Sequence, residues 1–396
     1  MSNQQQLTIG LFGFGVVGEG IYQVLQQTPS LNASIKTICI KHADKERNAP
    51  TALFTTDENS ILDDPEINVI VELIDDADAA YRIVKKAFAN KKAIVSANKK
   101  MIAEHLEELL KIQKEHAISF LYEAAVCGSI PVIRNLEEYY DNDLLSSFSG
   151  IVNGSTNYIL TKMSEDKLDF ATALKQAQDL GFAESNPALD IEGIDAVNKL
   201  SIVLKHAYGI TCLPSELIHR GINRLHPIDS IYAGEKGLQI KLVANAKHTG
   251  EQQIAAYVLP AFVNKDSQLY HVRNEFNGTI IGSKLADEQF LYGKGAGRFP
   301  TSSAVLSDIA ALRYGYKYEY KKSDNPLKYT LSYSKEIKVY LSFNAHCDIN
   351  RDDFTSIEES YSNHKRHFLI AYISLDKLNK ATWLNNQSIS LIVFNE

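Results

Sequence analysis

The chain has 396 residues, a formal net charge of −7, 45% hydrophobic residues and 22% charged residues. This composition is typical of soluble globular proteins and excludes disorder as the main state, while the negative charge argues against nucleic acid or an anionic membrane as the main partner. At roughly 100–200 residues per domain, the length predicts two to three domains.

The first 120 residues alternate between short apolar runs and helical patterns. The predicted strands are Leu7–Phe12, Ser34–Ile40, Val69–Ile74, Lys92–Ser96 and Ile118–Tyr122. The predicted helices between them are Glu19–Gln27, Tyr81–Ala89 and Ala103–His116. Alternation of this kind predicts a parallel, doubly wound sheet with helices on both faces.

From about residue 130 helices and strands segregate, which predicts an α+β domain. Its predicted helices are Ile130–Tyr140, Asn157–Ser164, Phe170–Leu180, Ile194–Tyr208 and Pro214–Arg220. Its predicted strands are Leu145–Val152, Gln239–Lys247, Gln253–Leu259 and Gly278–Gly282. A glycine-rich stretch, Gly293–Arg298, then precedes a helix from Thr301 to about Arg313.

The last part of the chain predicts a small appended α+β module after a linker at Tyr314–Tyr329. Strands are expected at Ile337–Phe343, His367–Leu375 and Ser388–Phe394, and helices at Phe354–Ser360 and Lys377–Leu384.

The motif Gly13-Phe14-Gly15-Val16-Val17-Gly18 follows a strand and opens a helix. That context is the one a dinucleotide fingerprint needs, because its glycines allow a tight turn, close approach of the pyrophosphate and packing of helix on strand. The pyrophosphate would bind at the helix N-terminus. The motif predicts a dinucleotide cofactor.

NAD sites usually place an acidic residue after the second strand to bind the ribose 2′-OH. Here Lys41 stands at that place. A lysine would attract a 2′-phosphate, so one interpretation is a preference for NADP, and the other is an ordinary solvated lysine.

Two further segments carry charged candidates. Lys99, in the segment Ser96–Lys100, follows a strand whose carboxyl end would face the cofactor cleft. The second segment runs from Gly181 to Lys199, with Glu184, Asp190, Glu192 and Asp195 between them. It is either a solvated helix start or a site in which carboxylates hold a cation and Lys199 binds a carbonyl oxygen.

Two strand-to-helix junctions are rich in small residues. In the first, Glu123 together with backbone carbonyls could bind a hard monovalent cation, or the segment is simply a turn. In the second, Asn153–Asn157, we expect Asn157 or a nearby Ser or Thr to cap the next helix.

Other sequence features predict a cytoplasmic protein. No apolar run approaches the roughly 18 residues of a membrane span, and Met1–Gln6 lacks the basic-then-apolar order of a signal peptide. The cysteines are far apart and form no CxxC motif, which predicts neither a disulfide framework nor a zinc site; they are Cys39, Cys127, Cys212 and Cys347.

Together and in this order, these motifs and the segment Gly293–Thr301 resemble the homoserine dehydrogenase family over roughly residues 7–313. The stretches Gly150–Lys162 and Leu180–Leu204 carry the resemblance most specifically. One difference is that Asp75 and Asp76 stand where members often have a small, glycine-containing pair.

The resemblance implies NAD(P)H-dependent interconversion of L-aspartate 4-semialdehyde and L-homoserine, a step toward threonine, methionine and isoleucine. Lys99 and Lys199 match the catalytic lysines of the family. The substrate residues implied are Glu184, Asp190, Asp195 and Lys199. The cofactor contacts implied or predicted are Gly13, Phe14, Gly15, Val16, Val17, Gly18, Lys41, Ser96, Lys99, Gly181, Glu184 and Gly297. A sodium-ion site is implied at Glu123, Val126, Gly128 and Ile130.

We therefore expect an α/β fold. A Rossmann-type doubly wound domain would cover residues 1–130, completed by 292–315, and an α+β substrate-binding and dimerisation domain would cover 131–291. A module over 330–396 resembles the ACT-like domain of some members. The resemblance implies the monofunctional form and a homodimer or higher homo-oligomer. The alternatives are another amino-acid or semialdehyde dehydrogenase, or a non-catalytic dinucleotide sensor.

Overall fold

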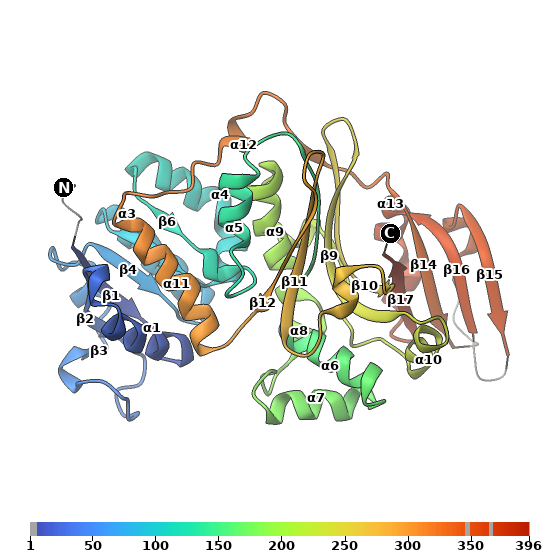
Figure 1. The fold of residues 1–396 in the computed structure, drawn as a ribbon, viewed down its shortest axis with the longest axis horizontal. Helices are drawn as coiled ribbons and strands as arrows, with labels where there is room; N and C mark the ends of the chain where they lie inside the picture. Colours follow the sequence, from blue (N-terminus) through green and yellow to red (C-terminus); the bar gives the residue numbers. More distant parts are fainter. Residues whose placement is uncertain (1–5, 345–348, 364–366, 396) are drawn as a thin grey trace. The chain divides into compact units, whose positions relative to one another are not determined.

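The computed structural model describes residues 6–344, 349–363 and 367–395, and the chain forms two units (Figure 1). Unit 1 comprises Met1–Asp141 and Lys294–Lys321, and unit 2 comprises Asn142–Gly293 and Lys322–Glu396. Unit 1 extends to Asp141, beyond the domain boundary expected at residue 130, and so includes the π-helical turn at Asn135–Tyr139.

Short apolar strands form the sheet of unit 1. The strand Val69–Glu72 is buried at all its positions, as expected for a strand covered on both faces. Within the described residues the sheet has six strands, in the order β3-β2-β1-β4-β5-β6, and all pair in parallel. The strands are β1 (Leu7–Phe12), β2 (Ala33–Cys39), β3 (Phe54–Thr55), β4 (Val69–Glu72), β5 (Ala93–Ser96) and β6 (Phe120–Leu121). This strand order is that of the Rossmann fold, which confirms the predicted doubly wound sheet.

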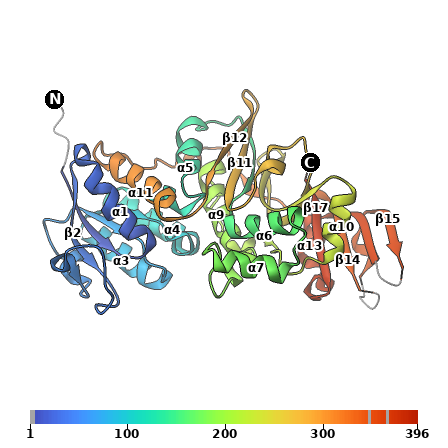
Figure 2. The ribbon, with the colours of Figure 1, turned by 60° about the horizontal axis from the view of Figure 1, so that its bottom comes forward.

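Helices cover both faces of this sheet, with α1 and α11 on one face and α3 and α4 on the other (Figures 1 and 2). The helices of unit 1 are α1 (Val16–Gln27), α2 (Asn59–Leu62), α3 (Ala77–Ala89), α4 (Lys99–His116), α5 (Val132–Arg134) and α11 (Arg298–Leu312). The returning helix α11 packs on α1, where a Cβ on Gly20 would lie 2.4 Å from Ser302 Oγ.

Unit 2 contains a mixed sheet of 11 strands within the described part of the chain. Nine of them follow the order β12-β11-β7-β9-β10-β17-β14-β16-β15, and β8 and β13 pair with β10. The strands are β7 (Leu145–Ile151), β8 (Ile218–His219), β9 (Gln239–Gly250), β10 (Gln253–Val263), β11 (Phe276–Ser283), β12 (Asp287–Lys294), β13 (Thr330–Leu331), β14 (Glu336–Phe343), β15 (Ser356–Ser362), β16 (His367–Ser374) and β17 (Ile389–Phe394). The helices are α6 (Gly154–Glu165), α7 (Phe170–Asp179), α8 (Ala188–Ile191), α9 (Ile194–Tyr208), α10 (Pro227–Glu235), α12 (Lys321–Asp324) and α13 (Leu375–Lys380).

The residues after 330 do not form a separate sheet, contrary to the predicted module. β17 pairs with β10 in parallel, so β14, β16 and β15 extend the sheet that begins with β12. One apolar core includes both parts, with Leu259 of β10 and Trp383 of the C-terminal segment among its members. The buried Asp229 of α10 also accepts a hydrogen bond from Ser390 of β17 at 2.6 Å.

Three predicted helices were wrong or only partly right. Phe354–Ser360 is instead largely the edge strand β15, whose pairing with β16 overrides the helical preference of its glutamates. Pro214–Arg220 contains a 3₁₀ turn and then the strand β8. In place of Lys377–Leu384, α13 begins at Leu375, where Ser374 caps it, and ends at Lys380. Among the elements that the residue pattern did not predict are β3, α2, α10 and β12.

No helix in the described ranges combines the length and apolarity that crossing a bilayer requires. Cys39, Cys127 and Cys212 are buried, and Cys347 lies outside the described residues.

Candidate active site

The turn between β1 and α1 holds the glycine motif. Gly13 has φ +92°, and a Cβ added there would lie 2.7 Å from the carbonyl oxygen of Leu73. A Cβ on Gly18 would lie 2.2 Å from the carbonyl oxygen of Gly13, whereas a Cβ on Gly15 would meet no atom within 4 Å. The fold therefore requires glycine at 13 and 18, while Gly15 leaves the N-terminus of α1 open to a ligand.

The other residues of the motif have different surroundings. The Phe14 ring packs edge-on against Phe54, with 5.1 Å between centroids. Val16 is 59% exposed. The carbonyl oxygen of Val17 accepts a hydrogen bond from Ser302 of α11 at 3.2 Å. Val16 is therefore the apolar side chain of the motif that a ligand could cover.

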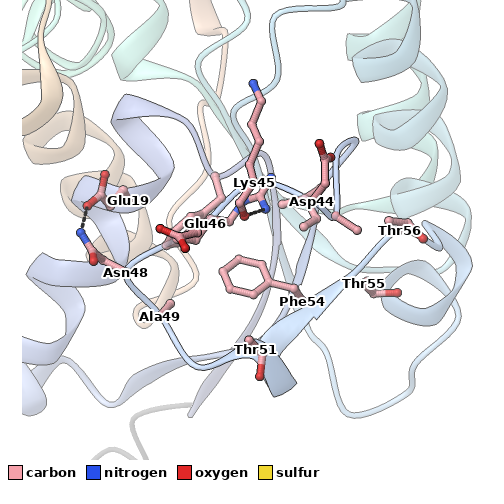
Figure 3. Close-up of a pocket in the computed structure, with 14 residues that line it drawn as sticks. Glu19, Asp44, Lys45, Glu46, Asn48, Ala49, Thr51, Phe54, Thr55 and Thr56 are labelled. Carbon is pink, nitrogen blue, oxygen red and sulfur yellow. Dashed lines mark hydrogen bonds between the residues drawn. The ribbon is translucent and has the colours of Figure 1, made fainter.

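An open pocket of about 1040 Å³ lies beside Phe14, between α1 and the segment that follows β2 (Figure 3). Arg47 donates to the carbonyl oxygens of His42 at 2.5 Å and Lys45 at 2.6 Å, and Asn48 donates to Glu19 at 3.4 Å. The lining residues are Phe14, Glu19, Ile40, Ala43, Asp44, Lys45, Glu46, Arg47, Asn48, Ala49, Thr51, Phe54, Thr55 and Thr56. The end of the second strand, beside the glycine motif, is the place where such folds bind the ribose of a dinucleotide.

Lys41 is exposed and lies two residues beyond the end of β2. The backbone N–H of Ala79 lowers the pKa of the Asp76 carboxyl, and the charge of Lys41 lowers this pKa further. The two side chains thus lie close enough to interact, and Asp76 offsets part of the positive potential that Lys41 would present to a phosphate.

Ser96 and Lys99 lie at the carboxyl end of the sheet of unit 1. Glu72 is fully buried there and accepts hydrogen bonds from Ser96 Oγ at 2.6 Å and the Ile74 N–H at 2.7 Å. Burial raises the pKa of Glu72 to about 7. Asn98 caps α4 with its side-chain oxygen, so Lys99 is the first residue of that helix. Glu72 therefore joins the loop after β4, through Ile74, to the end of β5, through Ser96, three residues before Lys99.

Glu123 is 2% exposed, and its carboxylate accepts the backbone N–H groups of Ile133 and Arg134, each at 2.9 Å. The fully buried Asp308 accepts the backbone N–H of Glu123 at 2.9 Å and pairs with Arg134 at 2.8 Å. Burial, and then the charge of Asp308, raises the pKa of Glu123 to about 8. The Arg134 guanidinium pairs with Asp308, whereas Glu123 is contacted by backbone N–H groups. A monovalent cation here would balance the charge of an ionised Glu123.

The remaining predicted cation ligands are the backbone carbonyls of Val126, Gly128 and Ile130. All three residues are buried, and Gly128 has φ +53°. The Ile130 carbonyl already accepts the Val132 N–H at 2.8 Å. Among the described residues, no three His, Cys, Asp or Glu side chains gather as a metal site. One carboxylate with neutral oxygens fits a hard monovalent cation better than zinc.

A buried polar network of unit 2 surrounds Lys199. Lys199 is 8% exposed and donates to Asp195 Oδ2 at 2.6 Å and to the Val152 carbonyl at 2.7 Å. The Asn153 amide donates to Asp190 Oδ1 at 2.7 Å and to Asp195 Oδ2 at 2.8 Å. All residues of α9 from Asp195 onward are buried. The interpretation of Asp195 and Lys199 as a solvated helix face is therefore wrong.

The ammonium group of Lys199 has three N–H donors, and two of them have partners among the described residues. The third can donate to a ligand oxygen. A buried ammonium paired with one carboxylate and one carbonyl is a fixed cation suited to binding a carbonyl oxygen on which negative charge develops.

Glu184 does not take part in this network in the described residues. It lies exposed in the loop after α7, where its backbone carbonyl accepts a hydrogen bond from Gln178 at 2.9 Å. Gly181 begins this loop with φ +75°, and Gly297 precedes α11 with φ +115°. Added Cβ atoms would meet nothing within 4 Å at Gly181 and only Pro300 at Gly297.

The cap of α6 is Asn153, not Asn157 or a nearby hydroxyl residue as predicted. Asn157 instead donates to the carbonyls of Val272, Asn274 and Phe276, and its oxygen accepts a hydrogen bond from the buried Lys241 at 3.0 Å.

Sequence reasoning missed three functional candidates: Glu72, Asn153 as a donor to the carboxylates, and Asp308. Glu72 could have been found as the single charge ending the apolar run Val69–Glu72. Asn153 and Asp308 gave no such signal, because their partners lie at least 37 residues away in the chain.

Comparisons with known proteins agree on one family. The family model described as the homoserine dehydrogenase NAD binding domain matches residues 13–123, and the one described as homoserine dehydrogenase matches residues 131–310. The chain is 39% identical to the homoserine dehydrogenase of Helicobacter pylori over 314 residues, which cover 77% of this chain and 73% of the relative. It is 34% identical to that of Bacillus subtilis over 315 residues, with 77% and 72% covered.

The structural likeness extends further along the chain. A solved homoserine dehydrogenase from Thiobacillus denitrificans superposes with a TM-score of 0.86 at 28% identity, and 99% of each chain is covered. The C-terminal strands, which lie beyond the residues that the family models match, therefore have a structural counterpart. With its Rossmann sheet, its glycine motif and its matched relatives, the chain belongs to the homoserine dehydrogenase family.

Proposed function

We propose that Lys99 and Lys199 carry, in this chain, the reaction of the family, which is the NAD(P)H-dependent reversible reduction of L-aspartate 4-semialdehyde to L-homoserine. The observation that supports this most is the buried pair of Lys199 and Asp195, held by Val152 and Asn153. A sensor that only bound a dinucleotide would have no need for this buried cation.

The bound dinucleotide supplies the hydride that reduces the aldehyde carbon. The third N–H of Lys199 donates to the aldehyde oxygen and stabilises its developing negative charge. Lys99 transfers the proton that this oxygen takes up. Glu184, Asp190 and Asp195 bind the substrate ammonium group through their carboxylates, with Glu184 contributing from its exposed loop.

The test is oxidation of the reduced cofactor with L-aspartate 4-semialdehyde and with a panel of other aldehydes and ketones. Replacing Lys99 with alanine is expected to lower kcat by about 10²–10⁴-fold, the usual contribution of a proton-transfer group. Lys100→Ala is the matched control, because Lys100 is exposed and only approaches Glu104 at 3.8 Å. Near-normal turnover in Lys99→Ala would remove Lys99 from the mechanism, and a better substrate in the panel would overturn the assigned reaction.

We also propose that the cofactor is NADP rather than NAD, with Lys41 binding the 2′-phosphate. The support is the exposed position of Lys41 beyond β2 and the absence of an acidic residue from that position. Lys41→Ala should lower the ratio of kcat/KM for NADPH to that for NADH by about 10-fold, as expected for one charged hydrogen bond. Lys111→Ala is the control, because Lys111 is an exposed lysine of α4 that does not line the pocket beside Phe14. A wild type that strongly favours NADH would contradict the proposal.

A sodium ion is proposed at Glu123 and the carbonyls of Val126, Gly128 and Ile130, because a cation would balance the excess carboxylate there. Thermal melting in sodium chloride, compared with choline chloride at equal ionic strength, should show a stabilisation that Glu123→Gln loses. Identical melting of the wild type in both salts would argue against the ion.

The last proposal is a homodimer or higher homo-oligomer formed through the sheet of unit 2, where β12 is an end strand. Light scattering on a sizing column measures this directly, and a monomer at micromolar concentration would contradict it.

A further inference from the structure

We infer that Asn153 is a positioning residue that fixes the Asp195–Lys199 pair; this inference rests on the proposed role of Lys199. Asn153 is 5% exposed and lies between β7 and α6, two residues after the strand ends. Its role differs from that of an ordinary helix cap, because only half of its hydrogen bonds serve the helix.

The Asn153 amide uses all four of its hydrogen-bonding positions. Its oxygen accepts the backbone N–H of Thr156 at 2.8 Å and the Thr156 hydroxyl at 2.9 Å. Its nitrogen donates to Asp190 at 2.7 Å and Asp195 at 2.8 Å. The reverse orientation would place an oxygen against two carboxylates and an NH₂ group against an N–H, so the partners determine which way the amide faces.

These contacts join the helix cap to the proposed catalytic lysine. Asp195 Oδ2 accepts hydrogen bonds from both Asn153 and Lys199, and Lys199 also donates to the carbonyl of Val152, the residue before Asn153. The backbone carbonyl of Val152 thus holds Lys199, and the side chain of Asn153 holds Asp195, the carboxylate partner of Lys199. The direction of the third Lys199 N–H follows from these two anchors.

No other cap residue provides the same contacts. Ser and Asp cap helices about as well as Asn. A serine side chain is too short to reach the two carboxylates in the same way and has one donor, and an aspartate would add a third carboxylate to the cluster. The cap and the positioning function can therefore be separated by substitution.

The experiment compares Asn153→Ser and Asn153→Asp with wild type in the semialdehyde assay. Each is expected to lower kcat by about 10²-fold, because a small displacement of a catalytic group has an effect of this size. The KM for the dinucleotide should not change. Asp169→Ala is the matched control, since Asp169 likewise caps its helix, α7, through both groups of a Thr: its Oδ1 accepts the backbone N–H of Thr172 at 2.9 Å and its Oδ2 accepts the hydroxyl at 2.9 Å. Asp169→Ala should lower the melting temperature but leave kcat unchanged.

A double-mutant cycle distinguishes positioning from general structural support. If Asn153 acts through the pair, Asn153→Ser lowers kcat in the wild type but causes no further loss in Lys199→Met. Equal losses in both backgrounds would overturn the inference, and so would normal kcat in both Asn153 variants while Lys199→Met is inactive. Near-normal turnover of Lys199→Met would instead refute the proposed function itself. If Asn153→Ser melts below the assay temperature, the isosteric Asn153→Asp gives the same comparison.

Discussion

The buried carboxyl of Glu72 makes the stability of unit 1 depend on pH, and Glu72→Gln tests this dependence. Burial raises the pKa of Glu72 from 4.5 to about 7 in the folded chain, despite the hydrogen bonds from Ser96 and Ile74. The unfolded chain releases this proton at its ordinary pKa, so between these values the folded state binds more protons than the unfolded state. The contribution of Glu72 to stability therefore falls as the pH rises from about 4.5 to about 7 and stays constant above that range.

The size of the effect follows from the two pKa values. At about 1.4 kcal/mol per pH unit, a rise from 4.5 to about 7 corresponds to about 3 kcal/mol in the free energy of unfolding. A glutamine keeps the shape and the acceptor for the Ile74 N–H but cannot ionise. The variant should therefore match the wild type near pH 4.5 and exceed it by up to about 3 kcal/mol above pH 7.

The assay is urea unfolding of both proteins at intervals between pH 4.5 and 8.5. Glu107→Gln is the control, because it changes an exposed glutamate of α4. If the curves for Glu72→Gln and wild type run parallel across this range, the buried carboxyl does not change its ionisation on folding and the reasoning is refuted.

Three further predictions concern the cofactor turn, the core of unit 2 and the C-terminal strands. Gly15→Ala should leave the melting temperature unchanged but raise the dinucleotide KM at least 10-fold. Gly18→Ala should destabilise the fold, because its added Cβ would lie 2.2 Å from the Gly13 carbonyl oxygen. Equal melting temperatures of the two variants would contradict this difference. Lys241→Met should lower the free energy of unfolding by about 1–3 kcal/mol, because the buried Asn157 oxygen loses its donor, and urea unfolding that matches wild type would contradict it. Deleting residues 335–396 should unfold unit 2, as seen by loss of cooperative melting, because β17 pairs with β10; a well-folded truncated protein would restore the idea of a separate module.

Local pattern was enough to predict most of the Rossmann sheet. The run Val69–Glu72 and the glycine motif each carry their own signal, one through continuous burial and the other through spacing. The doubly wound order then follows from alternation of strands and helices. Chain-order reasoning of this kind works where neighbouring elements in the sequence also pair in space.

The C-terminal strands show where that reasoning fails. β17 pairs with β10, which lies more than a hundred residues earlier, and no periodicity records such a pairing. The edge strand β15 has glutamates that favour a helix when taken alone, but its hydrogen bonds to β16 determine its conformation. Both errors concern long-range pairing rather than local preference.

The candidate site was predictable in its residues but not in its connections. Spacing put Asp195 and Lys199 on one helix face, and the structure shows the ion pair at 2.6 Å. The contact of the Asn153 amide with Asp190 and Asp195 depends on the turn between β7 and α6 lying beside the start of α9, and the burial of the pair depends on α9 packing on β9 and β10. Those contacts could not be derived from a single sequence, because the partners lie 37 and 42 residues apart.

The most direct measurement of the central claim is the turnover of Lys199→Met with L-aspartate 4-semialdehyde and reduced cofactor. Lys205→Met is its control, because Lys205 is also buried on α9 and donates to Thr211 rather than to Asp195. We expect Lys199→Met to lower kcat by about 10²–10³-fold, as for loss of one donor to a developing oxyanion, while Lys205→Met keeps most of the activity. Turnover of Lys199→Met close to that of the wild type would contradict the proposed role of Lys199.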